Sequence, residues 1–117
     1  MKSCASVAVD DGEELEVRRI DVDTRHRVVI RLRGPLTVRT AAVLRDVLVK
    51  VEQSGVPAVV VDLESVSHID AAGIGVLLAS RARLRKADRT LAVTTPQAPV
   101  RAALQITGAS DLIGGRE

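Results

Sequence analysis

The residues best suited to chemistry lie in one short stretch, Asp70-Ala71-Ala72-Gly73-Ile74-Gly75. It follows a valine-rich run and precedes an apolar pattern typical of a helix, so it should form the exposed start of that helix. Asp70 can cap the helix, because its carboxylate accepts hydrogen bonds from the first free backbone N–H groups at the positive end of the helix dipole. Gly73 and Gly75 weaken a helix, and glycine there usually indicates close approach of another backbone or a need for unusual dihedral angles. The stretch predicts a helix N-terminus on which another molecule docks.

The glycine spacing does not match the motifs that bind nucleotides. The dinucleotide fingerprint needs Gly or Ala at the position where this chain has Leu78, and no Gly-Lys-Ser/Thr sequence is present for a phosphate-binding loop. A free helix N-terminus can still hold an anion, so an enzyme or nucleotide-binding domain stays open as an alternative. A capped helix packed through small residues would explain the glycines equally well.

The other reactive side chains are scattered along the chain. His26 and His68 are the only histidines, and no His and Cys cluster has the spacing of a metal site. Ser67 and His68 precede Asp70, but neighbours in sequence do not make a catalytic triad. Cys4, the single cysteine, is either a redox thiol or an exposed thiol without a role. We expect no catalytic residues, no metal and no cofactor.

Composition narrows the class of protein. The 117 residues suffice for one domain, and none of them is Phe, Tyr or Trp, which excludes the aromatic surfaces on which single-stranded nucleic acids stack. A formal net charge of +2 is small for a DNA-binding protein, although the basic residues from Arg81 to Arg89 keep an acidic partner or nucleic acid as an alternative. No apolar run reaches the ~20 residues of a membrane span. With no internal disulfide possible, we expect a cytoplasmic protein.

The hydrophobic periodicity predicts an α/β domain with the element order β-β-α-β-α-β-α. Residues 1–14 are expected to form a flexible arm and residues 15–117 the domain. The expected elements are strands at 15–22, 28–33, 58–63 and 90–94, and helices around 44–51, 72–87 and 96–107. The first two strands form an antiparallel hairpin, and the strand–helix–strand units imply parallel neighbours with right-handed crossovers. The predicted sheet is therefore mixed.

The sequence around the predicted docking helix resembles a known family. The stretch from Val60 to Leu78 looks like the signature of the STAS domain family, which includes bacterial anti-sigma factor antagonists. Arg33-Gly34-Pro35-Leu36-Thr37 is similar to the family's loop before the first helix, and the stretch from Val100 to Gly108 to its last helix. Together these motifs cover residues 15–113 in the right order. The resemblance implies a STAS-like fold and a protein-interaction module rather than an enzyme.

The resemblance also implies a partner and a switch. In the family, the antagonist binds an anti-sigma factor, which is a serine kinase with an ATPase fold, and so releases a sigma factor. The Ser after the loop Asp is phosphorylated by that kinase, and the added negative charge in the docking surface dissolves the complex. Here Ala71 stands at the Ser position and Ala72 follows it, so the hydroxyl is missing. Thr37 also departs from the family, where many antagonists carry an acidic residue.

The resemblance implies one set of partner-binding residues. They are Leu36, Thr37, Ile69, Asp70, Ala71, Ala72, Gly73, Ile74 and Gly75. The chain is then either an antagonist that loop phosphorylation cannot switch off, or a relative with another partner, such as a transporter ATPase or a stress-signalling scaffold. The sequence predicts no particular oligomeric state.

Overall fold

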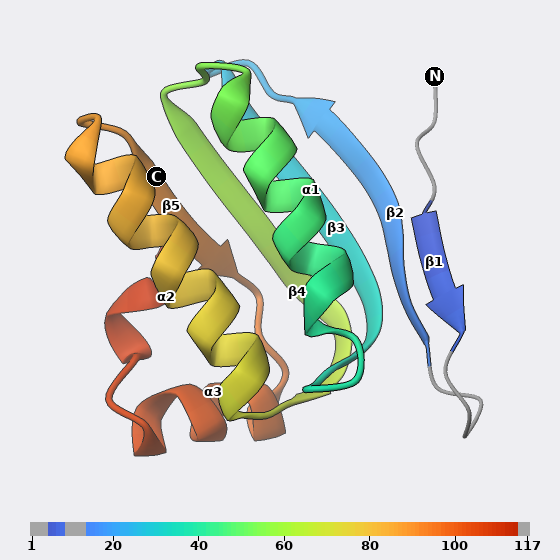
Figure 1. Ribbon diagram of the computed structural model, residues 1–117. Helices are drawn as coiled ribbons and strands as arrows, with labels where there is room; N and C mark the ends of the chain where they lie inside the picture. Colours follow the sequence, from blue (N-terminus) through green and yellow to red (C-terminus); the bar gives the residue numbers. More distant parts are fainter. Residues whose placement is uncertain (1–4, 9–13, 115–117) are drawn as a thin grey trace.

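A five-stranded mixed sheet forms the centre of the computed structural model, which describes residues 5–8 and 14–114. The elements in chain order are β1 (Ala5–Ala8), β2 (Glu14–Val22), β3 (Arg27–Leu36), α1 (Ala41–Gln53), β4 (Ala58–Ile69), α2 (Ala71–Lys86), β5 (Thr90–Thr94), α3 (Ala98–Ile106) and the 3-10 turn η1 (Ser110–Leu112) (Figure 1). The strands lie in the order β1-β2-β3-β4-β5. Pairing is antiparallel from β1 to β3 and parallel from β3 to β5. From β2 to α3 this confirms the predicted order and the mixed sheet.

Three strands differ from the sequence-based expectation: β1 is additional, β3 continues to Leu36 instead of ending at Arg33, and β4 is longer than expected. Ala5–Ala8 forms β1 on the edge of β2, inside the segment expected to be a flexible arm. A four-residue edge strand depends on pairing with its neighbour, so its own sequence carries little periodic signal. β4 continues to Ile69 instead of ending near Leu63. A register shift between β3 and β4 interrupts the alternation of buried and exposed residues there, which hid the second half of the strand.

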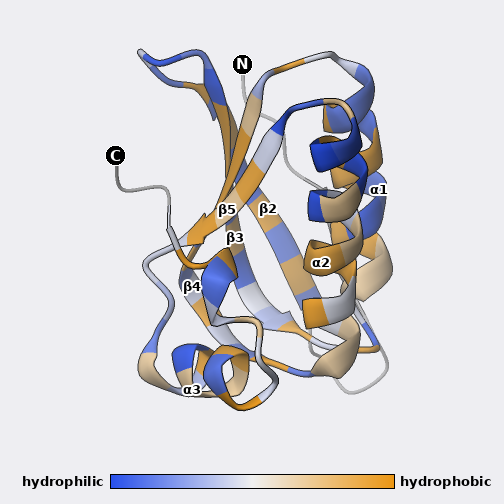
Figure 2. Cartoon of the chain, turned by 90° about the vertical axis from the view of Figure 1, so that its left-hand side faces the viewer, coloured by the Kyte–Doolittle hydropathy of each residue, from blue (hydrophilic) through white to orange (hydrophobic). Residues whose placement is uncertain are grey.

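The core lies mainly between the sheet and two helices. Figure 2 shows α1 and α2 on one face of the sheet, with α3 at its far end on the other side. Fully buried aliphatic side chains from both layers fill the space between them, among them Leu15, Ile30, Leu44, Leu63 and Leu77. Because the chain has no aromatic residue, each buried side chain removes a modest area from water, and the core depends on many close contacts. The core therefore holds α1 and α2 at fixed positions on the sheet.

Glu52, near the end of α1, ties this helix to α2. Its carboxylate accepts hydrogen bonds from the fully buried Ser80 Oγ (2.5 Å) and from Arg83 Nε (2.7 Å) and Nη2 (3.0 Å). Burial would raise the pKa of the Glu52 carboxyl, but the hydrogen bonds from Arg83 and Ser80 outweigh burial and hold that pKa below its usual value. The ionised carboxylate is therefore the form that the fold stabilises.

We expect the Glu52→Gln variant to lose about 1–2 kcal/mol of unfolding free energy at neutral pH, because charge-assisted hydrogen bonds are lost. The folded-state pKa lies below the unfolded-state value, so this stabilisation is present above the unfolded-state pKa and disappears as pH falls through the folded-state pKa. Urea denaturation of wild type and variant should therefore give a difference in unfolding free energy that shrinks as the pH is lowered below the usual pKa of a glutamate carboxyl. Asp46→Asn, an exposed carboxylate on the same helix, is the control. A difference that stays constant with pH would contradict the assignment.

Candidate functional site

Asp70 links the start of α2 to the loop between β3 and α1. Its Oδ1 accepts hydrogen bonds from the backbone N–H groups of Ala72 (3.0 Å) and Gly73 (3.2 Å), which confirms that its side chain caps the helix. Its Oδ2 accepts the backbone N–H of Val38 (3.0 Å), and its own N–H donates to the Leu36 carbonyl (3.2 Å). One side chain therefore holds two segments together that lie more than thirty residues apart in sequence.

The β3–α1 loop is held rigid by a buried threonine. Thr40 precedes α1 but its side chain does not cap that helix; it faces back into the loop. Its Oγ1 donates to the Pro35 carbonyl (2.8 Å) and accepts the Thr37 N–H (3.0 Å). Thr37 does not cap the helix with its hydroxyl either, since its Oγ1 accepts the Arg39 N–H (3.3 Å). The loop therefore presents its outward side chains from a fixed backbone.

The two glycines of the motif have different surroundings. A Cβ atom on Gly73 would lie 2.5 Å from the Leu36 carbonyl oxygen, 2.8 Å from Leu36 Cγ and 3.0 Å from Ile69 Cγ1. Gly73 therefore allows α2 to approach the end of β3, as the sequence predicts. A Cβ atom on Gly75 would meet nothing within 4 Å. Packing against the described residues therefore does not explain the exposed Gly75, although glycine costs a helix about 1 kcal/mol relative to alanine.

The structure divides the predicted binding residues into a surface and its support. Four of them are buried and support the exposed residues without reaching the surface: Leu36, Ile69, Gly73 and Ile74. The others reach the surface: Ala71 and Gly75 are exposed, and Thr37, Asp70 and Ala72 are half-buried. Thus the structure brings all nine together around the start of α2.

Val38 belongs to the same surface and was missed by the sequence reasoning. Its side chain is 73% exposed, and its backbone N–H is bonded to the Asp70 side chain. Exposed small residues continue along α2 at Ala79 and Ala82, on the helix face that carries Ala71 and Gly75. We call the set of Thr37, Val38, Ala71, Ala72, Gly75 and Ala79 the α2 surface. A β-branched residue in a short loop was the available sequence signal for Val38, but only its exposure distinguishes it from a core residue.

The remaining candidates form no second site in the part of the chain that the structure describes. Ser67 Oγ lies 3.2 Å from His68 Nδ1 on an exposed stretch, with no acid assigned to complete a triad. Within residues 5–8 and 14–114, no three His, Cys, Asp or Glu residues group as metal ligands, and no helix is long and apolar enough to cross a membrane. Cys4 lies outside the described residues.

Part of the basic segment in α2 is used inside the domain. Arg83 binds Glu52, Arg81 pairs with Asp111 at 3.3 Å, and Arg89 Nη1 donates to the carbonyl groups of Glu52 (2.9 Å) and Val56 (3.2 Å). These contacts fix the end of α2 to α1 and to the turn η1. Among the described residues, Arg85 and Lys86 are the cations of this segment with no such contact, and two charges are a small basis for binding an acidic partner or a nucleic acid.

Comparisons with known proteins show the family to which this chain belongs. The family model described as STAS domain matches residues 19–117. The chain is 30% identical over 84 residues to the anti-sigma-B factor antagonist of Staphylococcus aureus (strain NCTC 8325 / PS 47). The matched stretch covers 72% of this chain and 78% of that protein. The fold of the present chain is similar to that of the anti-sigma factor antagonist SpoIIAA in its unphosphorylated form, with a TM-score of 0.70 and 25% sequence identity. The match covers 82% of this chain and 84% of the SpoIIAA chain.

A further solved structure shares the fold. An anti-sigma factor antagonist from Mycobacterium paratuberculosis has a TM-score of 0.72 at 21% identity and covers 95% of this chain and 83% of its own. These relatives are regulators by name, in agreement with the expectation of a binding protein rather than an enzyme. The chain belongs to the STAS domain family, and within it resembles the anti-sigma factor antagonists.

Proposed function

We propose that this chain acts as an anti-sigma factor antagonist: it binds an anti-sigma factor of the serine-kinase type through the α2 surface and so releases a sigma factor. One observation carries the proposal. The exposed residues Val38, Ala71 and Gly75 form an apolar patch on a rigid frame, and the described part of the chain leaves that patch uncovered. The antagonist names of the relatives support the class of partner.

The shape of the α2 surface indicates what the partner must supply. Its residues are small, so the backbone of α2 is open to close approach. The chain has no aromatic residue to act as an anchor at an interface. The larger side chains of the contact therefore come from the anti-sigma factor, and Val38 is the largest apolar group that this chain contributes to the surface.

The proposed antagonist lacks the phosphorylation switch of its family. Ala71, which the resemblance matches to the phosphorylated Ser, is exposed and has no hydroxyl group. In the family a phosphate there places negative charge beside the loop Asp, inside the contact area. Because no phosphate can form at this residue, we expect the complex to persist when the kinase has ATP.

Binding to purified anti-sigma factors of the serine-kinase type from the same genome, measured by calorimetry, tests the proposal. Val38→Asp should weaken binding at least about tenfold, because it places a charge in an apolar contact. Ile106→Asp is the matched control, since Ile106 is also an exposed apolar residue (84%) but lies on α3. We expect its affinity to stay within about twofold of wild type.

Two outcomes would contradict parts of the proposal. If none of these anti-sigma factors binds the wild-type chain, the proposed function is wrong. If Ile106→Asp weakens binding and Val38→Asp does not, the function stands and the α2 surface is the wrong contact. The Ala71→Ser variant tests the switch: once bound, it should be phosphorylated and released when ATP is added, whereas the wild-type complex should remain.

A further inference from the structure

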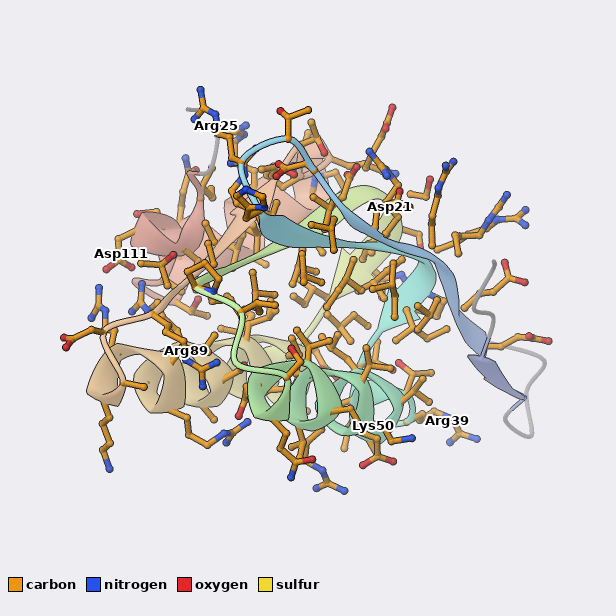
Figure 3. The ribbon with its side chains drawn as sticks, turned by 90° about the horizontal axis from the view of Figure 1, so that it is seen from above. Asp21, Arg25, Arg39, Lys50, Arg89 and Asp111 are labelled. Atoms are coloured by element: carbon orange, nitrogen blue, oxygen red, sulfur yellow. The ribbon has the colours of Figure 1, made fainter. Side chains whose placement is uncertain are left out.

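The open face of the sheet carries a polar hollow that the proposed function does not use. It has a volume of about 350 Å³ and is lined by Arg18, Arg19, Arg31, Leu32, Asp62, Glu64 and Ser65. Figure 3 shows Asp21, which pairs with two of these arginines, on the side of the sheet away from α1 and α2. The α2 surface begins at a helix on the opposite face, so the two regions are distinct (Figure 2).

Two irregularities of the sheet meet at this hollow. Opposite β3, strand β2 has one extra residue, Arg18, between Val17 and Arg19. On the other side of β3, strand β4 also has one extra residue, because Arg31 pairs with Asp62 but Arg33 pairs with Ser65. A bulge bends its strand and redirects a side chain. Bulges on both neighbours of the same β3 segment therefore open the sheet face where the hollow lies.

Two of the arginines at the hollow share one carboxylate oxygen. Arg19 and Arg31 are direct cross-strand partners, an arrangement that like charges destabilise. Both contact the same oxygen, Asp21 Oδ2, at 2.8 Å from Arg19 Nε and 3.1 Å from Arg31 Nη1. One carboxylate oxygen therefore serves two cations that face each other, and an additional oxyanion would relieve their repulsion.

The carboxylates that line the hollow do not neutralise Arg18. Asp62 is occupied by Arg31 Nε (3.3 Å), by Thr95 Oγ1 (2.6 Å) and by the Glu64 N–H (2.9 Å). The assigned ion pair of Arg18 in the described chain is with Glu16, at 3.9 Å, near the outer limit for such a contact. Three arginines and two carboxylates line the hollow. Asp21 and Glu16, beside it, pair with those arginines, and the pairing of Arg18 is the longest of them. Glu64 is the carboxylate with no assigned ion pair, so it can accept a hydrogen bond from a ligand.

We propose that this hollow binds a small anionic metabolite that carries a phosphate or carboxylate group next to a hydroxyl group. The oxyanion lies between the guanidinium groups of Arg18 and Arg19, and the hydroxyl group donates to Glu64. The volume is at the lower end of small-molecule sites, which favours a ligand of a few carbon atoms over a nucleotide. The polar lining selects a polar ligand, because the only apolar residue on it is Leu32.

The test uses glycerol phosphate, glycerate, inorganic phosphate and uncharged glycerol as probes, followed by calorimetry and amide chemical shifts of the whole chain. Glycerol phosphate or glycerate should bind saturably with a Kd of about 1 mM or tighter, and glycerol should not bind. The stronger of the two identifies the oxyanion as phosphate or carboxylate. Arg18→Gln and Arg19→Gln should each weaken this binding about tenfold. Arg25→Gln is the matched control, because Arg25 is an exposed arginine in the β2–β3 turn, away from the lining (Figure 3).

The Glu64→Gln variant separates the two parts of the proposed site. It should strengthen the binding of inorganic phosphate, because a negative charge next to the anion is removed. The advantage of glycerol phosphate over inorganic phosphate should shrink, because the Glu64 carboxylate that accepts the hydroxyl hydrogen bond is lost. Absence of saturable binding by any anionic probe overturns the proposal. So does a loss of affinity in Arg25→Gln equal to that in Arg18→Gln, since binding would then follow overall charge.

Discussion

Replacing Gly73 with alanine is expected to lower the unfolding free energy by about 1–3 kcal/mol, while the same change at Gly75 should raise it by up to about 1 kcal/mol. Alanine favours a helix at both positions, so any difference in sign comes from packing. At Gly73 the new methyl group would lie 2.5 Å from the Leu36 carbonyl oxygen, which accepts the Asp70 N–H and cannot move freely. At Gly75 the methyl group enters open space.

Urea denaturation of the two alanine variants measures this difference directly. Gly75→Ala serves as the control for helix propensity, because it lies in the same helix turn and differs only in what surrounds it. If both variants are stabilised, α2 does not approach β3 as closely as the structure has it. Binding of Gly75→Ala to an anti-sigma factor then reports separately on whether the partner needs the space that Gly75 leaves.

Replacing Asp70 with alanine is the second change with a large expected effect, a loss of about 2 kcal/mol in unfolding free energy. An N-cap side chain alone contributes about 0.5–2 kcal/mol. Here the same carboxylate also accepts the Val38 N–H, so its removal leaves donors of two segments without their partner. Asp70→Asn keeps one acceptor oxygen and should retain the cap of α2 while losing the bond to Val38.

Hydrogen exchange separates the two roles of Asp70. The Val38 amide should exchange faster in both variants, whereas the amides of Ala72 and Gly73 should exchange faster only in Asp70→Ala. Thermal melts should place Asp70→Asn between the alanine variant and wild type. Unchanged exchange at Val38 in Asp70→Ala would contradict the link between the loop and α2, and with it the fixed position of Val38 in the α2 surface.

Much of the fold was predictable because its signals are local. The stripe of Leu44, Val47, Leu48 and Val51 predicts α1, and the boundaries of β5 follow from the run Thr90–Thr94 between turn residues. β1 and the second half of β4 were not predictable in the same way. Edge pairing and bulges depend on the neighbouring strand, so a single strand's sequence does not display them.

The amino-acid sequence by itself determined the α/β class, the Asp70 cap, and the absence of a hydroxyl group at Ala71, because each of these depends on residue type and on neighbours along the chain. Only the tertiary structure decided which residues of the motif a partner can reach. Leu36 and Val38 are both aliphatic and lie two positions apart, yet Leu36 is fully buried and Val38 is 73% exposed. Gly73 and Gly75 are the same residue type, yet only one faces β3. The reason is that exposure depends on how segments distant in sequence pack together, here the end of β3 against the first turn of α2.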